Sequence, residues 1–539
     1  MKMNTTGHDS AVLGTSALRH DLTASVVVFL VALPLCLGIA LASNAPPFAG
    51  LLAGIVGGIV VGILSGSGSS VSGPAAGLAA VVATQIHAVG SFEAFLLVVV
   101  FAGIIQIAFG LARFGMLARF MPTSVIKGLL AAIGVILIIK QFPNLAGFQK
   151  SGADNEPGPW DLVAMLHQIH AGSAAIGLTS LGLLLAWDRF KVLKKSPVPA
   201  PLVVVVFGVA VSEGLRLIPG IEPLGSSLLV KVPSAKTFGE FIGFLSLPDF
   251  SQVANPVIYT AAFTVAAVAS IETLLNLEAV DNLDSLKRHS PPNRELLAQG
   301  IGNVVSGMIG GLPLTSVIVR SSVNLNMGAK TKLSAIVHGF LLLGCVALMP
   351  SFLNLIPLSC LAAILIATGI KLASPGLVIE KWEMGRNQFL PFVVTVTTII
   401  ATDLLVGIIA GLAVQYALNL WGGAPLNSTF RTPVELDRHD EGQGRAIVAN
   451  AATFSNWVHI RSRLVSEGLH ATMVLDLSET RFIDATVMLK IRELQQEFQR
   501  AGGSLKVEGL EEHKPETSHP TASRRRLIPP ASGNPFTKA

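Results

Sequence analysis

Long apolar runs separated by short polar connections occupy residues 22–421 of the chain. A helix that crosses the hydrocarbon core of a bilayer needs about 20 predominantly apolar residues. The apolar runs predict membrane helices at 22–43, 47–66, 91–112, 122–141, 172–188, 197–215, 254–280, 295–310, 330–350, 352–371, 387–403 and 404–421. Two shorter apolar segments, 72–88 and 312–326, bring the expected number of membrane segments to about fourteen.

The two short segments hold corresponding places, because each is the third segment in its half of the membrane region. Each opens next to Gly and Pro, and each is too short to cross a bilayer alone. Paired short segments with such interruptions indicate a transporter built from inverted repeats. We therefore predict an α-helical multi-pass membrane protein, with repeat one at about 22–215 and repeat two at about 254–421.

The pattern changes after Trp421, where strands and amphipathic helices alternate. The segments 445–453, 471–479 and 504–510 are typical of strands, and 454–469 and 484–502 are typical of helices. This order predicts a small α/β domain with a largely parallel sheet at 433–515. Residues 516–539 are rich in Pro, Ser and Arg, which predicts a disordered basic tail.

Composition and charge support a membrane protein and exclude other classes. Hydrophobic residues make up 51% of the chain and charged residues 13%, about half the charged fraction of a typical soluble domain. The net charge of +5 comes from short loops between apolar runs, so it does not indicate nucleic-acid binding. Basic loops at 113–119, 189–195, 287–294, 330–332 and 381–386 predict cytoplasmic termini, including a cytoplasmic N-terminus at 1–21, in a bacterial inner membrane.

Reactive residues are few and scattered. Cys36, Cys345 and Cys360 lie in apolar segments without metal-ligand spacing, so we interpret them as small buried hydrophobic residues. No Ser/His/Asp or Cys/His set has plausible catalytic spacing. The sequence therefore predicts neither an enzyme nor a resident cofactor, apart from a coupling ion such as Na⁺ or H⁺.

The two short segments predict half-helices whose N-termini meet inside the membrane. Each helix N-terminus carries unpaired N–H groups and about half a positive charge, so two facing ends suit an anion. Pro74 and Pro313 fit the first helical turn of each. Arg320 would lie within the first two turns of the second half-helix, and helical side chains lean toward the N-terminus. The alternative is that Arg320 only holds helices together by pairing with a carboxylate.

Glu272 is the candidate partner, with Asn276 one turn later on the same helix face. An ionised carboxylate there is costly unless a proton, a cation or Arg320 neutralises it. Glu272 could therefore couple anion transport to Na⁺ or H⁺, or it could form a simple salt bridge with Arg320.

Several motifs resemble the SulP family of anion transporters. They are SGPAAGL (72–78), SIETLLNLEAVDNL (270–283), ELLAQGIGNVVSGMIGGLPLT (295–315) and Arg320. The resemblance implies fourteen helices in two inverted seven-helix repeats, which form core and gate domains, and a cytoplasmic STAS domain at the C-terminus. It also implies elevator-type alternating access, a homodimer in the lipid bilayer and a cytoplasmic partner of the STAS domain.

The resemblance also implies the positions of the site. Its anion-binding residues would be Pro74, Ala75, Ala76, Leu314, Thr315, Ser316 and Arg320, and its coupling residues Glu272, Asn276 and Thr315. The expected substrate is an inorganic oxyanion, bicarbonate or sulfate. A small dicarboxylate, an uncoupled channel or exchanger, and a membrane sensor with the STAS-like domain as output remain alternatives.

Overall fold

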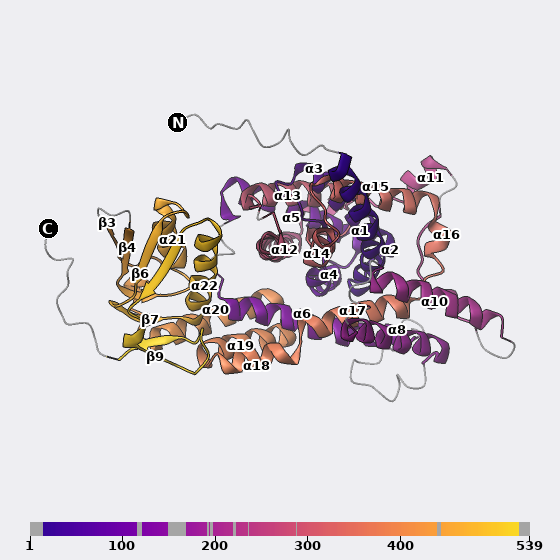
Figure 1. Ribbon diagram of the computed structural model, residues 1–539. Coiled ribbons are helices and arrows are strands. Elements are labelled where there is room, and N and C mark those ends of the chain that lie inside the picture. Colours follow the sequence, from indigo (N-terminus) through magenta and orange to yellow (C-terminus); the bar gives the residue numbers. More distant parts are fainter. Residues whose placement is uncertain are drawn as a thin grey trace. The chain divides into compact units, whose positions relative to one another are not determined.

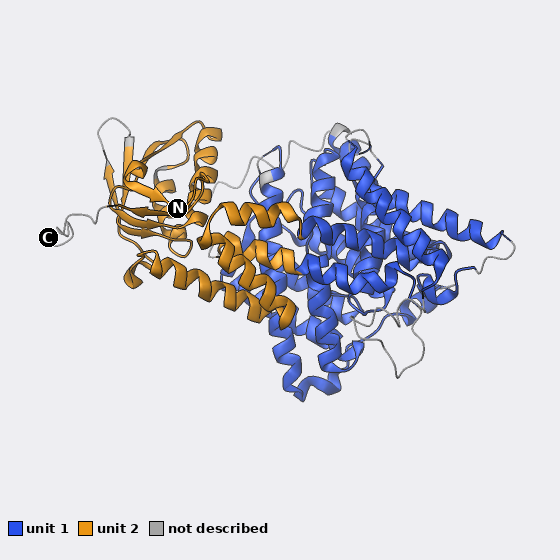
Figure 2. Cartoon of the chain, turned by 90° about the horizontal axis from the view of Figure 1, so that it is seen from below, with its two compact units in different colours: residues 1–115, 133–372 blue, residues 116–132, 373–539 orange. Residues whose placement is uncertain are grey.

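The computed structural model describes residues 15–115, 121–148, 169–190, 193, 198–218, 223–234, 237–286, 288–438 and 443–527. The chain divides into two compact units: residues 1–115 and 133–372 form unit 1, and residues 116–132 and 373–539 form unit 2 (Figure 2). Unit 1 consists mainly of helices, and unit 2 combines helices with the C-terminal α/β region.

The helices of unit 1 follow the predicted segments. They are α1 (Thr15–Ala42), α2 (Pro47–Val56), the π-helical η1 (Gly57–Val61), α3 (Gly62–Leu64), α4 (Ala76–Val89), α5 (Phe92–Leu111), α8 (Ala171–Arg189), α10 (Ala200–Arg216), α11 (Phe238–Gly243), α12 (Pro256–Leu283), α13 (Pro292–Met308), α14 (Ile318–Asn326), α15 (Leu333–Leu348), α16 (Pro350–Leu353) and α17 (Leu358–Leu372). Helix α6 (Thr123–Leu145) contributes to both units. In the described part of the chain, eight helices are long and apolar enough to cross a membrane. The number of fourteen passes stays a prediction.

Polar side chains mark where several of these helices begin. Ser91 accepts a hydrogen bond from the backbone N–H of Ala94 at 3.1 Å at the start of α5. Asp403 accepts one from Val406 at 2.9 Å at the start of α20 (Leu404–Trp421). Each cap satisfies an N–H group that has no partner within its helix, which typically stabilises the helix by about 1 kcal/mol.

Unit 2 contains α18 (Pro375–Glu383), α19 (Arg386–Ala401), α20 and the predicted α/β region. Strands β3 (Val434–Arg438), β4 (Gln443–Val448), β6 (Thr472–Asp476) and β8 (Ser504–Glu508) form one sheet in that order. The β4–β6 and β6–β8 pairs are parallel, and β3 pairs antiparallel with β4. Helices α21 (Trp457–Leu464) and α22 (Ala485–Arg500) share a core with this sheet through Trp457, Leu475, Val487 and Phe498. The predicted α/β region is confirmed.

A second sheet corrects the prediction for the end of the chain. Its order is β5 (Asn450–Ala452), β7 (Thr480–Ile483), β10 (Arg524–Arg526) and β9 (His513–Pro515). The prediction of a disordered tail from residue 516 is wrong as far as Leu527, because β10 pairs with both β7 and β9. Backbone pairing orders this basic segment although it adds little apolar surface. Residues 528–539 and 1–14, and parts of the basic loops at 113–119, 189–195 and 287–294, lie outside the described residues.

Candidate anion-binding site

Two short strands in unit 1 bring the two Gly/Pro segments together. Strand β1 (Ser72–Pro74) pairs antiparallel with β2 (Leu314–Ser316), and Gly73 lies opposite Thr315. We predicted that Pro74 and Pro313 lie in the first turns of the two half-helices, which is wrong, because α4 begins at Ala76 and α14 at Ile318. Extended backbone inside apolar protein needs hydrogen-bond partners, and the two strands supply them to each other.

The strand pair sets the positions of both helix N-termini. Each strand leads directly into its helix, so α4 and α14 leave the antiparallel pair in opposite directions. Each N-cap residue lies one position beyond its strand, so the two helix starts are about four residue steps, or roughly 13 Å, apart along the pair. Ala75 is the N-cap residue of α4 and Ala76 its first residue, and Val317 is the N-cap residue of α14. Two partial positive charges therefore lie at opposite ends of the strand pair.

Arg320, the third residue of α14, adds a full charge between these ends. Its side chain is 0% exposed. Nη2 donates a hydrogen bond to Cys36 Sγ at 3.3 Å, and Cζ lies 3.1 Å from the position that a Cβ atom on Gly73 would occupy. The guanidinium therefore leans back from α14 onto β1, as expected for a helical side chain. Nε and Nη1 are buried and have no hydrogen-bond partner among the described residues, so both nitrogens remain able to donate to a ligand.

Glu272 lies on α12, and its carboxylate contacts the start of α4. Its Cδ lies 2.7 Å from the position that a Cβ atom on Gly77 would occupy, and the Gly77 backbone interacts with the carboxylate. Oε2 is enclosed and has no hydrogen-bond partner within the part of the chain that the structure describes. In the described part of the chain, Glu272 and Arg320 form no ion pair with each other. The salt-bridge alternative is therefore contradicted, because the carboxylate lies at the N-terminus of α4 instead.

Asn276 and Thr315, the other predicted coupling residues, meet at one backbone carbonyl. Asn276 Nδ2 donates to the carbonyl oxygen of Ser316 at 2.7 Å, and Thr315 Oγ1 donates to the same oxygen at 3.1 Å. Helix α12 thus contacts β2 as well as α4 and α14, and Figure 1 shows these helices gathered in one region of unit 1. The structure brings the predicted residues together, but their roles in binding and coupling remain predictions.

The sequence analysis did not identify two features near the site, which are Cys36 and a polar face of α13. Cys36 was interpreted as a small hydrophobic residue, yet its sulfur accepts a hydrogen bond from the candidate anion-binding arginine. Helix α13 carries Glu295, Gln299, Asn303 and Ser306, all at most 1% exposed. Their spacing of four, four and three residues places them on one helix face. A polar stripe on a predicted membrane helix is a signal that could have identified this face.

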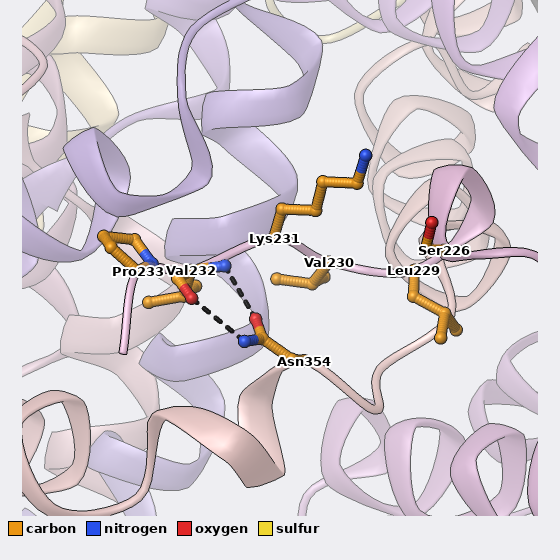
Figure 3. A pocket seen from close by; sticks show the side chains of 7 residues that line it. All are labelled: Ser226, Leu229, Val230, Lys231, Val232, Pro233 and Asn354. Atoms are coloured by element: carbon orange, nitrogen blue, oxygen red, sulfur yellow. Dashed lines mark hydrogen bonds between the residues drawn. The ribbon is translucent and has the colours of Figure 1, made fainter. Parts of the chain in front are cut away.

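A surface pocket elsewhere in unit 1 is not part of this site. It is lined by Ser226, Leu229, Val230, Lys231, Val232, Pro233 and Asn354 (Figure 3). Its one charged side chain is Lys231, and it contains none of the predicted site residues.

Among the described residues, no cluster of three or more His, Cys, Asp or Glu side chains could hold a metal ion.

Apolar helices, paired broken helices and a buried arginine at their strand pair define a multi-pass membrane protein with a site suited to anions. The sequence profile of the Sulfate permease family matches residues 18–397, and the chain belongs to this family. A putative sulfate transporter, YvdB of Bacillus subtilis, is 24% identical over 93% of this chain and 93% of its own length. The bicarbonate transporter BicA of Picosynechococcus is 27% identical over 80% of this chain and 77% of its own length.

Solved structures support the same fold. The transmembrane domain of a cyanobacterial BicA has a TM-score of 0.60 and 26% identity, covering 74% of this chain and 98% of that domain. The structure of SLC26A9 has a TM-score of 0.65 and 16% identity, covering 91% of this chain and 84% of that one. The predicted class of α-helical multi-pass membrane protein with a C-terminal α/β region is confirmed. The relatives are transporters and not enzymes, as predicted.

Proposed function

We propose that the protein is a secondary active transporter of an inorganic oxyanion, bicarbonate or sulfate, across the cytoplasmic membrane. Relatives named as transporters of each anion support this substrate class. The observation that carries the proposal is the fully buried Arg320 beside the strand pair, because no described residue accepts a hydrogen bond from its Nε or Nη1. A buried guanidinium with unused donors is costly when the site is empty and becomes favourable when an anion accepts its hydrogen bonds.

The anion would lie at the β1–β2 pair, and Ala75, Ala76 and Thr315 would contact it together with Arg320. The two helix N-termini contribute about one positive charge together, and Arg320 contributes a second. An ionised Glu272 at the start of α4 would cancel one of them. The site then suits a monovalent anion, and a proton or Na⁺ on Glu272 would make a second negative charge tolerable. In this way Glu272, with Asn276 and Thr315, would couple the anion to the cation.

The remaining features of the proposal follow the family. They are elevator-type alternating access, a homodimer, cytoplasmic termini and a C-terminal STAS domain that binds a cytoplasmic partner. The α/β fold of the C-terminal region and the similarity to SLC26A9 over most of the chain support the STAS assignment.

Uptake into proteoliposomes tests the proposal directly. Purified protein should accumulate labelled bicarbonate or sulfate when a sodium gradient or a pH gradient is imposed, and protein-free vesicles should not. Comparing the two anions under each gradient identifies the substrate and the coupling ion. Conductance that dissipates the anion gradient without accumulation would instead support an uncoupled channel.

A further inference from the structure

Strand β2 pairs with β1 along one edge, and among the described residues no strand lies along its second edge. Leu314 and Ser316 point their backbone N–H and C=O groups toward this open edge. Asn303 Oδ1 accepts from the Leu314 N–H at 2.7 Å, and Asn303 Nδ2 donates to the Leu314 carbonyl at 3.1 Å. Thr273 Oγ1 accepts from the Ser316 N–H at 3.4 Å, and Asn276 donates to its carbonyl at 2.7 Å. Side chains of α12 and α13 therefore replace a third strand.

Asn303 is held in one orientation by a further hydrogen bond. Its Nδ2 also donates to Gln106 Oε1 at 2.6 Å, and Gln106 Nε2 donates to Ser270 Oγ at 3.3 Å. The Asn303 oxygen faces a donor, and its nitrogen faces two acceptors, so a flipped amide would place like groups together. Asn303 is 1% exposed, so bulk water does not reach its amide.

Close packing of α5 against α13 makes this arrangement possible. A Cβ atom on Gly103 would lie 2.6 Å from the Gly300 carbonyl oxygen, and one on Gly300 would lie 2.7 Å from the Gly103 carbonyl oxygen. Small residues at both positions let the helix backbones approach each other. Gln106 and Asn303 follow three residues later on their helices, and they meet in the resulting close contact.

We propose that Asn303 is a positioning residue for the anion site, which it holds in register through both backbone groups of Leu314. The inference rests on the proposed transport function and adds a residue that does not itself touch the anion. Leu314 precedes the N-cap residue of α14 by three positions, so a displaced Leu314 displaces the start of α14 and Arg320. Misplacement of a binding group by about 1 Å can cost 100-fold in activity.

Two substitutions test whether the Asn303 side chain holds Leu314 in place. Asn303→Asp keeps an acceptor for the Leu314 N–H but replaces the donor that serves Leu314 and Gln106. Asn303→Leu has a similar size and removes both functions. We expect both variants to raise the KM for the transported anion at least about 10-fold in proteoliposomes, with rates normalised to inserted protein. Hydrogen exchange in residues 312–318 should also become faster.

Asn354 provides a matched control, because it clamps a different backbone segment in the same way. Its Oδ1 accepts from the Val232 N–H at 2.6 Å, and its Nδ2 donates to the Val232 carbonyl at 2.9 Å (Figure 3). Asn354→Asp should leave the anion KM at the wild-type value. An equal rise in KM in this control would overturn the assignment, because it would show a general effect of losing an amide clamp.

The outcomes separate the inference from the proposed function. A wild-type protein that transports an anion, together with Asn303 variants of unchanged KM, overturns the inference alone. A wild-type protein that transports neither anion overturns the proposed function, and the inference with it. If the Asn303 variants do not insert into the membrane, Gln106→Leu decides. This variant removes the hydrogen bond that orients the Asn303 amide and leaves Asn303 itself in place. A raised KM in that variant supports the inference, and an unchanged KM overturns it.

Discussion

Glu272 and Arg320 contact different parts of the same strand–helix segment: Glu272 lies against Gly77 at the start of α4, and Arg320 lies against Gly73 in β1. In the described part of the chain, the two side chains therefore contact the site at different residues and do not pair with each other. An anion bound at the strand pair would meet the guanidinium directly, and an ionised Glu272 would compete with it for the N-terminus of α4.

Arg320→Ala should reduce anion transport by about 100-fold or more in Vmax/KM, because it removes one of about two positive charges at the site. Uptake into proteoliposomes measures this loss. Arg216→Ala is the control, since Arg216 forms an exposed ion pair with Glu213 at 2.9 Å on α10 and should transport normally. Near wild-type uptake by the Arg320 variant would refute the site assignment.

Gly73→Ala should disturb the same guanidinium without changing any charge. The added methyl group would lie 3.1 Å from Arg320 Cζ and would contact Nη1 more closely still, so either the side chain or β1 must move. We expect at least about a 10-fold fall in Vmax/KM. Gly182→Ala in α8 is the matched control, because a Cβ atom there meets nothing within 4 Å. Equal activity of the two variants would show that Arg320 does not depend on contact with β1.

Glu272→Gln should separate anion binding from coupling. Glutamine resembles the protonated carboxyl in shape, so binding should survive, whereas accumulation driven by a sodium or proton gradient should be lost. Breaking a buried salt bridge would cost about 3–5 kcal/mol of stability, but Arg320 does not pair with Glu272, so thermal stability should stay near the wild-type value. Binding, accumulation and thermal unfolding are measured together, with Glu213→Gln as an exposed control. A stable variant that still concentrates its anion would exclude Glu272 from coupling.

The membrane segments, the two broken helices and Arg320 were predictable because each leaves a local signal. Apolar length identifies a span, and Gly and Pro mark an interruption. The strand pair was not predictable, since each strand has three residues and its partner lies more than two hundred positions away in the sequence. Cys36 was missed because a cysteine in an apolar helix gives no pattern, and only the folded structure brings Arg320 to its sulfur.

In the C-terminal region, the sequence predicted the parallel sheet but not strand β10. Alternating strands and helices predicted the parallel sheet, because its elements are contiguous and periodic. Strand β10 was missed, since an arginine-rich segment has the composition of a tail. Its order comes from partners supplied by β7 and β9, and Arg525 also donates to the backbone carbonyl of Trp421 at 2.7 Å.

The last prediction concerns Asp484, the N-cap residue of α22. Its buried carboxylate accepts hydrogen bonds from the backbone N–H groups of Val487 at 2.7 Å and Phe454 at 2.5 Å, and from Asn419 on α20 at 3.4 Å. Burial nevertheless raises the pKa of Asp484 to about 6, from an ordinary value of 3.8. At a pH between about 4 and about 6, Asp484 therefore holds a proton in the folded state that it has released in the unfolded state.

The free energy of unfolding of this region should therefore fall as the pH rises from about 4 to about 6, by roughly 3 kcal/mol, and should stay level above that range. Hydrogen exchange of the α22 amides, corrected for the intrinsic exchange rate at each pH, measures the change. Asp484→Asn should remove the slope. Asp476→Asn is the control: burial opposes ionisation of Asp476, but hydrogen bonds from Ser478 and Arg445 lower its pKa below the usual range. The contribution of Asp476 to the free energy of unfolding therefore changes only below about pH 4. The Asp476 variant should keep the wild-type slope between pH 4 and 6. A wild-type slope in the Asp484 variant would show that another group titrates in this region.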